Sequence, residues 1–210
     1  MEAVLAFSTA STGLVAVQAG GRLVMRFNEN RRGQVEYLIP LIDSALDEAG
    51  ISYKDLSRIG IVVGPGSFTG LRVGLAAARG FGLALKIPVV GISAFELYAK
   101  ASAQHGRVLV ALDTQRDDCF SIGYDGEKIW LPPMVRDSAT LQQIINQVQP
   151  TVLGDAFSQL NGQHELPAEN AQLAAALLAL TLSGDPAEQP PEPYYLRAPD
   201  IGGIKAGTPA

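Results

Sequence analysis

A glycine-rich run, GPGSFTGLRVG at residues 64–74, is the part of the sequence whose composition and spacing could do chemistry. The apolar residues 59–63 precede it and predict a buried strand, and the Ala- and Leu-rich residues 70–85 follow it and predict a helix. Such a junction points backbone N–H groups and the positive end of the helix dipole at one place. An anion-binding loop is therefore the first hypothesis.

Neither common phosphate motif fits this run. The GxxxxGK[ST] loop needs a lysine after its last glycine, but Gly70 is followed by Leu71 and Arg72. The dinucleotide fingerprint GxGxxG needs a glycine where Thr69 stands. Thr69 or Ser67 is instead placed to accept the first free amides of the helix as its N-cap.

The small residues of the predicted helix have a regular spacing. Gly70, Gly74, Ala78 and Gly82 recur every four residues, so they form a nearly bare stripe on one face. Each glycine inside a helix costs about 0.5–1 kcal/mol relative to alanine. The stripe therefore implies close approach of another helix or backbone, which is either this protein's own sheet or a second chain.

Composition and charge narrow the classes of function. With 47% hydrophobic and 18% charged residues among 210, the chain can build a folded core. With a net charge of −5, the chain lacks the basic surface that binding a phosphate backbone requires, so any RNA contact is expected to come mostly through another subunit. Cys119 is the single cysteine, which excludes an internal disulfide. Without a signal-peptide pattern or a bilayer-length apolar run, we expect a cytoplasmic protein.

The order of predicted elements occurs twice. Each half reads as three antiparallel strands, a helix, a strand and a helix, and Val4 and Val108 begin equivalent strands 104 residues apart. Gly20-Gly21 and Asp125-Gly126 are typical of two-residue hairpins. The predicted strands are 4–8, 14–19, 22–28, 59–63, 88–91, 107–112, 119–124, 128–131 and 151–154, and the predicted helices are 34–49, 70–85, 94–103, 139–147 and 170–183.

This duplication is typical of an α/β fold of two ribonuclease-H-like lobes, the architecture of actin, Hsp70 and sugar kinases. We predict a first lobe at residues 1–104 and a second, reduced lobe at residues 105–210. The Pro-rich tail that begins at Asp185 is expected to lie extended over the surface.

The glycine-rich run also resembles a known family. Together with EYLIPLI at residues 36–42 and PYYLRAPD at residues 193–200, it is similar to the TsaB (YeaZ) family, in matching order from about Leu5 to Asp200. The resemblance implies the same two-lobed fold and a non-catalytic role in bacterial tRNA threonylcarbamoyladenosine biosynthesis. It implies binding to the TsaD subunit, which modifies adenosine 37 of tRNAs that read ANN codons, and docking of the TsaE ATPase on that pair.

The resemblance further implies that the first-lobe helices 34–49 and 70–85 contact TsaD. The same surface could form a homodimer when TsaD is absent, because an exposed apolar helix face favours burial. The small-residue stripe would then allow close packing between chains. The predicted interface residues are Gln34, Leu38, Ile42, Gly70, Gly74, Ala78 and Gly82.

Two positions depart from the family pattern. Kinases of this architecture place an acidic residue at the end of the first strand, and many TsaB sequences have Asp there, but this chain has Ser8. A hydroxyl lacks the charge that Mg²⁺ prefers. Gln34 stands where the family often has His, and an amide does not titrate. Asp113, with Arg116 nearby, ends the equivalent strand of the second lobe and is either part of a polar loop or a weak ligand or partner contact.

The remaining reactive residues form no recognisable set. His105 and His164 lie in unrelated segments without paired-ligand spacing, and Ser67 in GSFTG does not match GxSxG. Cys119 is expected in the core. We therefore predict no catalytic residue, no metal and no cofactor, while weak nucleotide binding at a lobe or subunit interface stays open. The alternatives are a small-molecule kinase or ATPase of the actin-like fold and a glycoprotease-like hydrolase.

Overall fold

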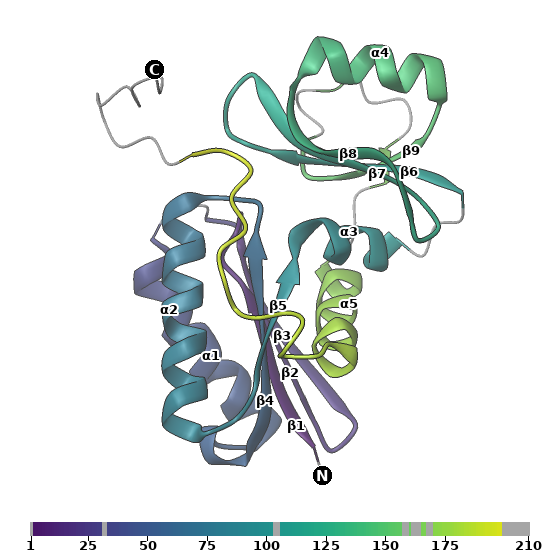
Figure 1. Ribbon diagram of the computed structural model, residues 1–210. Helices are drawn as coiled ribbons and strands as arrows, with labels where there is room; N and C mark the ends of the chain where they lie inside the picture. Colours follow the sequence, from purple (N-terminus) through teal and green to yellow (C-terminus); the bar gives the residue numbers. More distant parts are fainter. Residues whose placement is uncertain are drawn as a thin grey trace.

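The computed structural model describes residues 2–30, 33–102, 106–156, 160, 165–166 and 170–198. These residues form two α/β lobes, each built on a five-stranded sheet (Figure 1). The predicted α/β fold class is confirmed, including the repeated strand pattern. In the described part of the chain, no helix is both long and apolar enough to cross a membrane.

The first lobe contains the N-terminal sheet, in the strand order β3-β2-β1-β4-β5. Strand β2 is antiparallel to both of its neighbours, β1 and β3, whereas β4 is parallel to both of its neighbours, β1 and β5. The strands are β1 (Ala3–Ser8), β2 (Gly13–Ala19), β3 (Arg22–Asn28), β4 (Leu56–Gly64) and β5 (Val89–Ser93), and the helices that precede the second lobe are α1 (Gln34–Ala49), η1 (Tyr53–Asp55), α2 (Phe68–Leu85) and α3 (Ala94–Ser102).

Local signals fix where the first two helices begin and end. Helix α1 lies between Gly33 and Gly50, which have φ of 80° and 71°, in the left-handed region that glycine adopts without steric cost. Helix α2 begins at its N-cap Ser67, whose hydroxyl accepts a hydrogen bond from the Gly70 amide at 3.3 Å. Of the two predicted N-caps, Ser67 is the observed one.

The second lobe repeats the pattern in the order β10-β9-β6-β7-β8. The turn residue Gly126 of the predicted β7–β8 hairpin has φ of 62°. Asp137 caps α4 by accepting a hydrogen bond from the Thr140 amide at 2.8 Å. The elements are β6 (Arg107–Asp113), β7 (Asp118–Asp125), β8 (Lys128–Asp137), α4 (Ser138–Val148), β9 (Thr151–Gly154) and β10 (Glu165–Leu166).

Helix α5 (Asn170–Ser183) lies on the first sheet, so its assignment to the second lobe is wrong. It packs against β1, β2 and β4, on the face opposite α1 and α2 (Figure 1). Gly60 of β4 makes room for it, because a Cβ there would overlap the Thr181 hydroxyl. Arg58 of β4 donates hydrogen bonds to the Thr181 and Gly184 carbonyls at 3.0 and 2.8 Å, which satisfies the C-terminal end of the helix.

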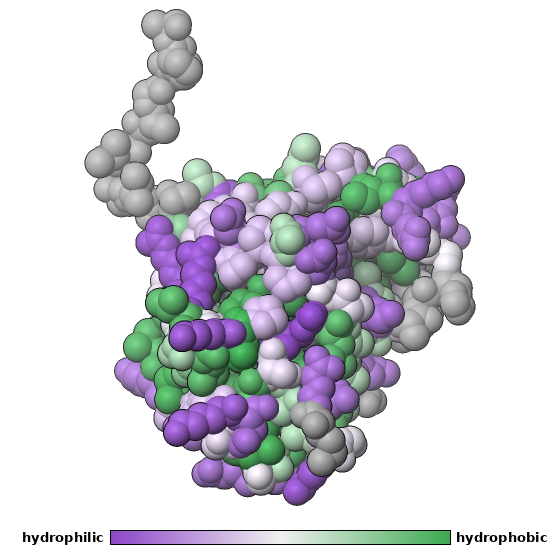
Figure 2. Space-filling model, turned by 60° about the horizontal axis from the view of Figure 1, so that its bottom comes forward, coloured by the Kyte–Doolittle hydropathy of each residue, from purple (hydrophilic) through white to green (hydrophobic). Residues whose placement is uncertain are grey.

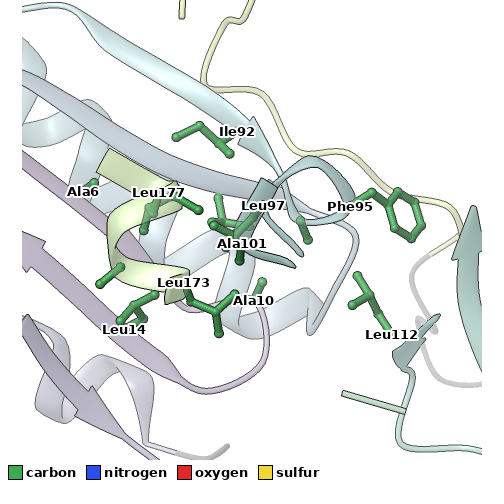
Figure 3. Packing of buried hydrophobic residues seen from close by; sticks show 14 of the residues in the cluster. Ala6, Ala10, Leu14, Ile92, Phe95, Leu97, Ala101, Leu112, Leu173 and Leu177 are labelled. Atoms are coloured by element: carbon green, nitrogen blue, oxygen red, sulfur yellow. The ribbon is translucent and has the colours of Figure 1, made fainter. Parts of the chain in front are cut away.

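Three clusters of buried apolar residues form the cores of the lobes and the contact between them. One lies between the first sheet and α1 and α2, and another between the second sheet and α4. The third runs from α5 and α3 into the second sheet and therefore joins the two lobes, with Phe95 and Leu97 of α3 in the same cluster as Leu112 of β6 (Figure 3).

The chain from Gly184 to Ala198 has no helix or strand, and it crosses the first lobe as the Pro-rich composition predicts (yellow in Figure 1). Backbone hydrogen bonds attach it. The Gly91 amide donates to the Gln189 carbonyl and the Tyr194 amide to the Val63 carbonyl, both at 2.8 Å. The Arg79 side chain also donates to the Pro191 carbonyl at 2.8 Å.

Candidate functional site

A cavity of about 370 Å³ lies between the two lobes. Four parts of the chain line it: the turn after β1, the junction of β4 and α2 at residues 65–69, residues 113–116 and 120 at the end of β6 and in β7, and the tail at residues 194–198. The sequence-predicted residues Ser67 and Asp113 both lie in its wall. Clefts of this size between lobes are common sites for ligands or partner segments.

Some amides of the glycine-rich run form hydrogen bonds within the protein. The Ser67 amide donates to the Ala10 carbonyl at 2.6 Å, and the Leu71 amide donates to the Ser67 carbonyl at 2.8 Å. On the other side, the fully buried Thr9 hydroxyl donates to the Gly70 carbonyl at 2.8 Å. The loop is thus fastened to the turn after β1 by hydrogen bonds in both directions.

The small-residue stripe of α2 faces the protein's own sheet. A Cβ at Gly70 would overlap the Thr9 carbonyl, and a Cβ at Gly74 would overlap the Thr9 hydroxyl and lie 3.0 Å from Ile61 Cδ1. A Cβ at Gly82 would overlap Val89. The assignment of these glycines to an interface between chains is wrong, because the close approach that they permit is to the turn after β1 and to β4 and β5 of the same lobe.

The other predicted interface residues are also inside the molecule. Leu38, Ile42 and Ala78 are at most 2% exposed and belong to the core between the sheet and its two helices. The structure therefore contradicts their place in an interface as well. Gln34 begins α1, but its side chain lies outside the described part of the structure.

A partner can reach other residues of α1 and α2, which lie on the side of these helices that faces away from the sheet. We define the outer stripe as five exposed small or apolar residues of these helices: Val35, Ile39, Ala76, Gly80 and Leu83. Leu83 is 83% exposed and Val35 68%. Hydrophobic surface gathers on the side of the first lobe along which α2 runs (Figure 2). The spacing of residues 76, 80 and 83 already indicated this face in the sequence. The more regular spacing of Gly70, Gly74 and Gly82 favoured the opposite face.

Ser8, at the position expected to be acidic, is 8% exposed, and its hydroxyl accepts a hydrogen bond from the Ala10 amide at 3.3 Å. It therefore shapes the turn after β1. Asp113 holds its own loop in the same way, since its carboxylate accepts from the Gln115 amide at 2.6 Å. These contacts fit the polar-loop interpretation of Asp113, although the residue also borders the cavity.

Asp155 is an acidic residue that the sequence interpretation missed. Its carboxylate accepts a hydrogen bond from the Asp113 amide at 2.8 Å, so it connects the ends of β9 and β6. Its signal was an acid directly after the predicted strand Thr151–Gly154, at the same sheet edge as Asp113. Among the residues that the structure describes, no three His, Cys, Asp or Glu are grouped so as to hold a metal ion. His105 and His164 lie outside the described residues.

Cys119 lies in β7 and is fully buried, as predicted. Burial raises the pKa of its thiol to about 12, and the nearby charges of Asp113, Asp118 and Asp155 act in the same direction. The thiol consequently stays protonated near neutral pH and is no nucleophile.

Alkaline pH is expected to destabilise the fold. Burial also raises the pKa of Tyr124 to about 12, so the folded chain keeps protons on Tyr124 and Cys119 that the unfolded chain releases from about pH 9. Because the folded state then binds more protons, stability falls as pH rises between about 9 and 12. The melting temperature should fall from pH 8.5 to pH 11, and less steeply in Cys119→Ala. A melting temperature that is flat over this range would contradict the pKa shifts.

The family model described as "TsaD: tRNA N6-adenosine threonylcarbamoyltransferase" matches residues 28–171. The protein named "tRNA threonylcarbamoyladenosine biosynthesis protein TsaB" of Escherichia coli K12 is 29% identical over 133 residues, which is 60% of this chain. The match spans 58% of that relative, less than two thirds of its length.

Two solved structures from Pseudomonas aeruginosa have the same fold. One is described as an uncharacterized protein with similarity to peptidase YEAZ, with a TM-score of 0.67 and 25% identity over 94% of this chain and all of the other. The other, YeaZ, has a TM-score of 0.71 and 22% identity over 93% of this chain and all of the other. Since the family model covers more than half of the chain, the protein belongs to the family that this model describes, and proteins named TsaB are among its relatives.

Proposed function

We propose that this chain is a non-catalytic subunit in the formation of N6-threonylcarbamoyladenosine at position 37 of tRNA, where it binds and activates a TsaD-like transferase. Family membership supports the pathway, because the relative from Escherichia coli is named for threonylcarbamoyladenosine biosynthesis. The observation that carries the subunit role is the glycine-rich loop, whose hydrogen bonds fasten it to the turn after β1.

A nucleotide-binding cleft would need backbone amides and a metal-binding acid at this place. Here the Ser67 amide is bonded to the Ala10 carbonyl, and the hydroxyl of Ser8 stands at the position of the acid. These contacts make the loop a structural connection between α2 and the sheet. They favour the scaffold over the kinase or ATPase alternative.

The outer stripe is the proposed contact surface for the TsaD-like subunit. Leu83 and Val35 expose large apolar side chains there, and burial of apolar surface contributes roughly 25 cal/mol per Å². Ala76 and Gly80 add little bulk between them, so a partner helix can approach to the ordinary packing distance of about 8–10 Å. Without the partner, the same surface would pair two copies of the chain.

The other partners follow from this arrangement. A TsaE-like ATPase would dock on the pair that the two subunits form. With a net charge of −5, the chain would contact tRNA only through the complex, since phosphate contacts need Lys and Arg.

Leu83→Asp should weaken binding to the TsaD-like subunit at least roughly tenfold while the monomer stays folded, because a carboxylate would be desolvated in the contact. Titration calorimetry with the TsaD-like protein of the same cell measures the affinity, and the threonylcarbamoyladenosine content of tRNA measures the activity. Leu23→Asp is the matched control, since Leu23 is also an exposed leucine but lies on β3, beside the buried Val24 and on the other face of the sheet.

Equal affinity of Leu83→Asp and wild type would overturn the surface assignment. The non-catalytic role itself is tested by a separate measurement. If the purified chain alone turned over MgATP, and Asp113→Ala abolished this turnover, the non-catalytic role would be wrong and the kinase or ATPase alternative would replace it.

A further inference from the structure

The two lobes are joined differently on the two sides of the molecule. On the side of α3, Phe95 and Leu97 share one apolar cluster with Leu112 of the second sheet (Figure 3). Phe120 of β7 belongs to the same cluster. On the other side, the cavity separates the lobes, and the tail passes along it. One side is therefore closed by packing between the lobes and the other by the tail, whose Tyr194, Tyr195 and Leu196 also pack against this apolar cluster.

The tail is fixed firmly to the first lobe. We define the strap as residues 189–197. Its beginning is held by the hydrogen bond from the Gly91 amide and its middle by the bond to the Val63 carbonyl. Two glycines make room for it: a Cβ at Gly91 would overlap the Pro190 carbonyl, and a Cβ at Gly64 would overlap the Tyr194 carbonyl. The sheet is thus shaped to receive the strap.

The end of the strap reaches the second lobe. The Tyr195 ring packs on Phe68 of α2, with ring centroids 5.1 Å apart. Two residues further along, Arg197 forms an ion pair with Asp118, the first residue of β7. The Thr114 hydroxyl also donates a hydrogen bond to the Asp118 carboxylate, which holds this acid in place. The strap therefore connects a seat on the first lobe to one carboxylate of the second.

We infer that the strap is a latch between the lobes, closed by the ion pair between Arg197 and Asp118. When the pair breaks, the second lobe turns about the apolar contact at α3 and the cavity opens. The pair can break because both side chains are more than a quarter exposed, so water and salt compete for it. Salt does not weaken the apolar contact on the other side, and excluded salts strengthen such burial. Ionic strength thus controls how often the cavity is open.

The test measures the distance between the lobes. Spin labels are attached at Lys54→Cys in η1 and Gln147→Cys in α4, two exposed positions in different lobes. The native thiol of Cys119 does not compete for label, because it is buried. Pulsed electron resonance then gives the distribution of distances in the whole chain.

Arg197→Gln should raise the population at long distance about two- to fivefold, the range expected for the loss of a partly exposed ion pair. Arg197→Lys keeps the charge and should stay close to wild type. Arg107→Gln is the matched control, because Arg107 and Asp125 form an ion pair within the second sheet. Molar salt should move wild type, but not Arg197→Gln, toward the long distances.

A distance distribution of Arg197→Gln that equals those of wild type and Arg107→Gln would overturn the latch. An unchanged wild-type distribution in molar salt would do the same. Circular dichroism melting shows that each variant is folded before its distances are interpreted.

Discussion

Gly74→Leu is expected to lower the melting temperature of the isolated chain sharply. The new side chain would enter the space between α2 and the sheet, where the Thr9 hydroxyl and Ile61 already fill the site. Overpacking of this kind typically costs about 1–3 kcal/mol, and each kcal/mol lowers the melting temperature by roughly 2–4 °C in a chain of this size.

Even Gly74→Ala should destabilise, although helix propensity alone predicts the reverse. Its Cβ would displace the fully buried Thr9 hydroxyl from the Gly70 carbonyl, and an unsatisfied buried polar group costs about 1–3 kcal/mol. Gly80→Ala is the control in the same helix, since a Cβ there meets nothing within 4 Å. It should gain about 0.5–1 kcal/mol. A more stable Gly74→Ala variant would show that the stripe does not face the sheet.

The second large effect is expected at Gly60→Ala, which should loosen α5 from the first sheet. The added methyl group would overlap the Thr181 hydroxyl, and both residues are buried. We expect a loss of roughly 2–3 kcal/mol in the free energy of unfolding, because neither the strand nor the helix can move without breaking its packing. Denaturant titration followed by circular dichroism measures this loss.

The double variant Gly60→Ala, Thr181→Ala should recover part of that stability, because the second change removes the overlapping hydroxyl. Thr181→Ala alone gives up a hydrogen bond to the Leu177 carbonyl at 2.7 Å, so its own effect should be about 0.5–1.5 kcal/mol. The two changes must therefore be non-additive. Strictly additive losses would mean that α5 does not rest on Gly60.

The sequence by itself determined the elements and their order. Hairpins were predictable at Gly20-Gly21 and Asp125-Gly126 because two-residue turns need positive φ, and Gly20, Gly21 and Gly126 have it. The bounds of α1 and α5 were predictable from their apolar runs and, for α1, from Gly50. Duplication of this order predicted two lobes, since local patterns repeat wherever the same supersecondary unit repeats.

The partners of each surface were decided only by the tertiary structure. Spacing showed that Gly70, Gly74 and Gly82 share a face, but a face without side chains can pack closely against any neighbour. The neighbours proved to be the turn after β1, β4 and β5. Helix α5 is apolar over nearly its whole length, with no polar face that would indicate which sheet it covers. Its place on the first sheet depends on Gly60 and Arg58, more than 100 residues away.

The candidate site shows the same division. Ser67 and Asp113 could be selected from the sequence because they stand at strand ends and a helix start, where local patterns predict exposed polar groups. Asp155, Tyr195 and Arg197 reach the site through long-range contacts. Four segments far apart in the sequence line one cavity only after both sheets have formed and α5 has returned the tail to the first lobe. Local periodicity carries no information about such long-range contacts, because they depend on which packed surfaces the whole chain brings together.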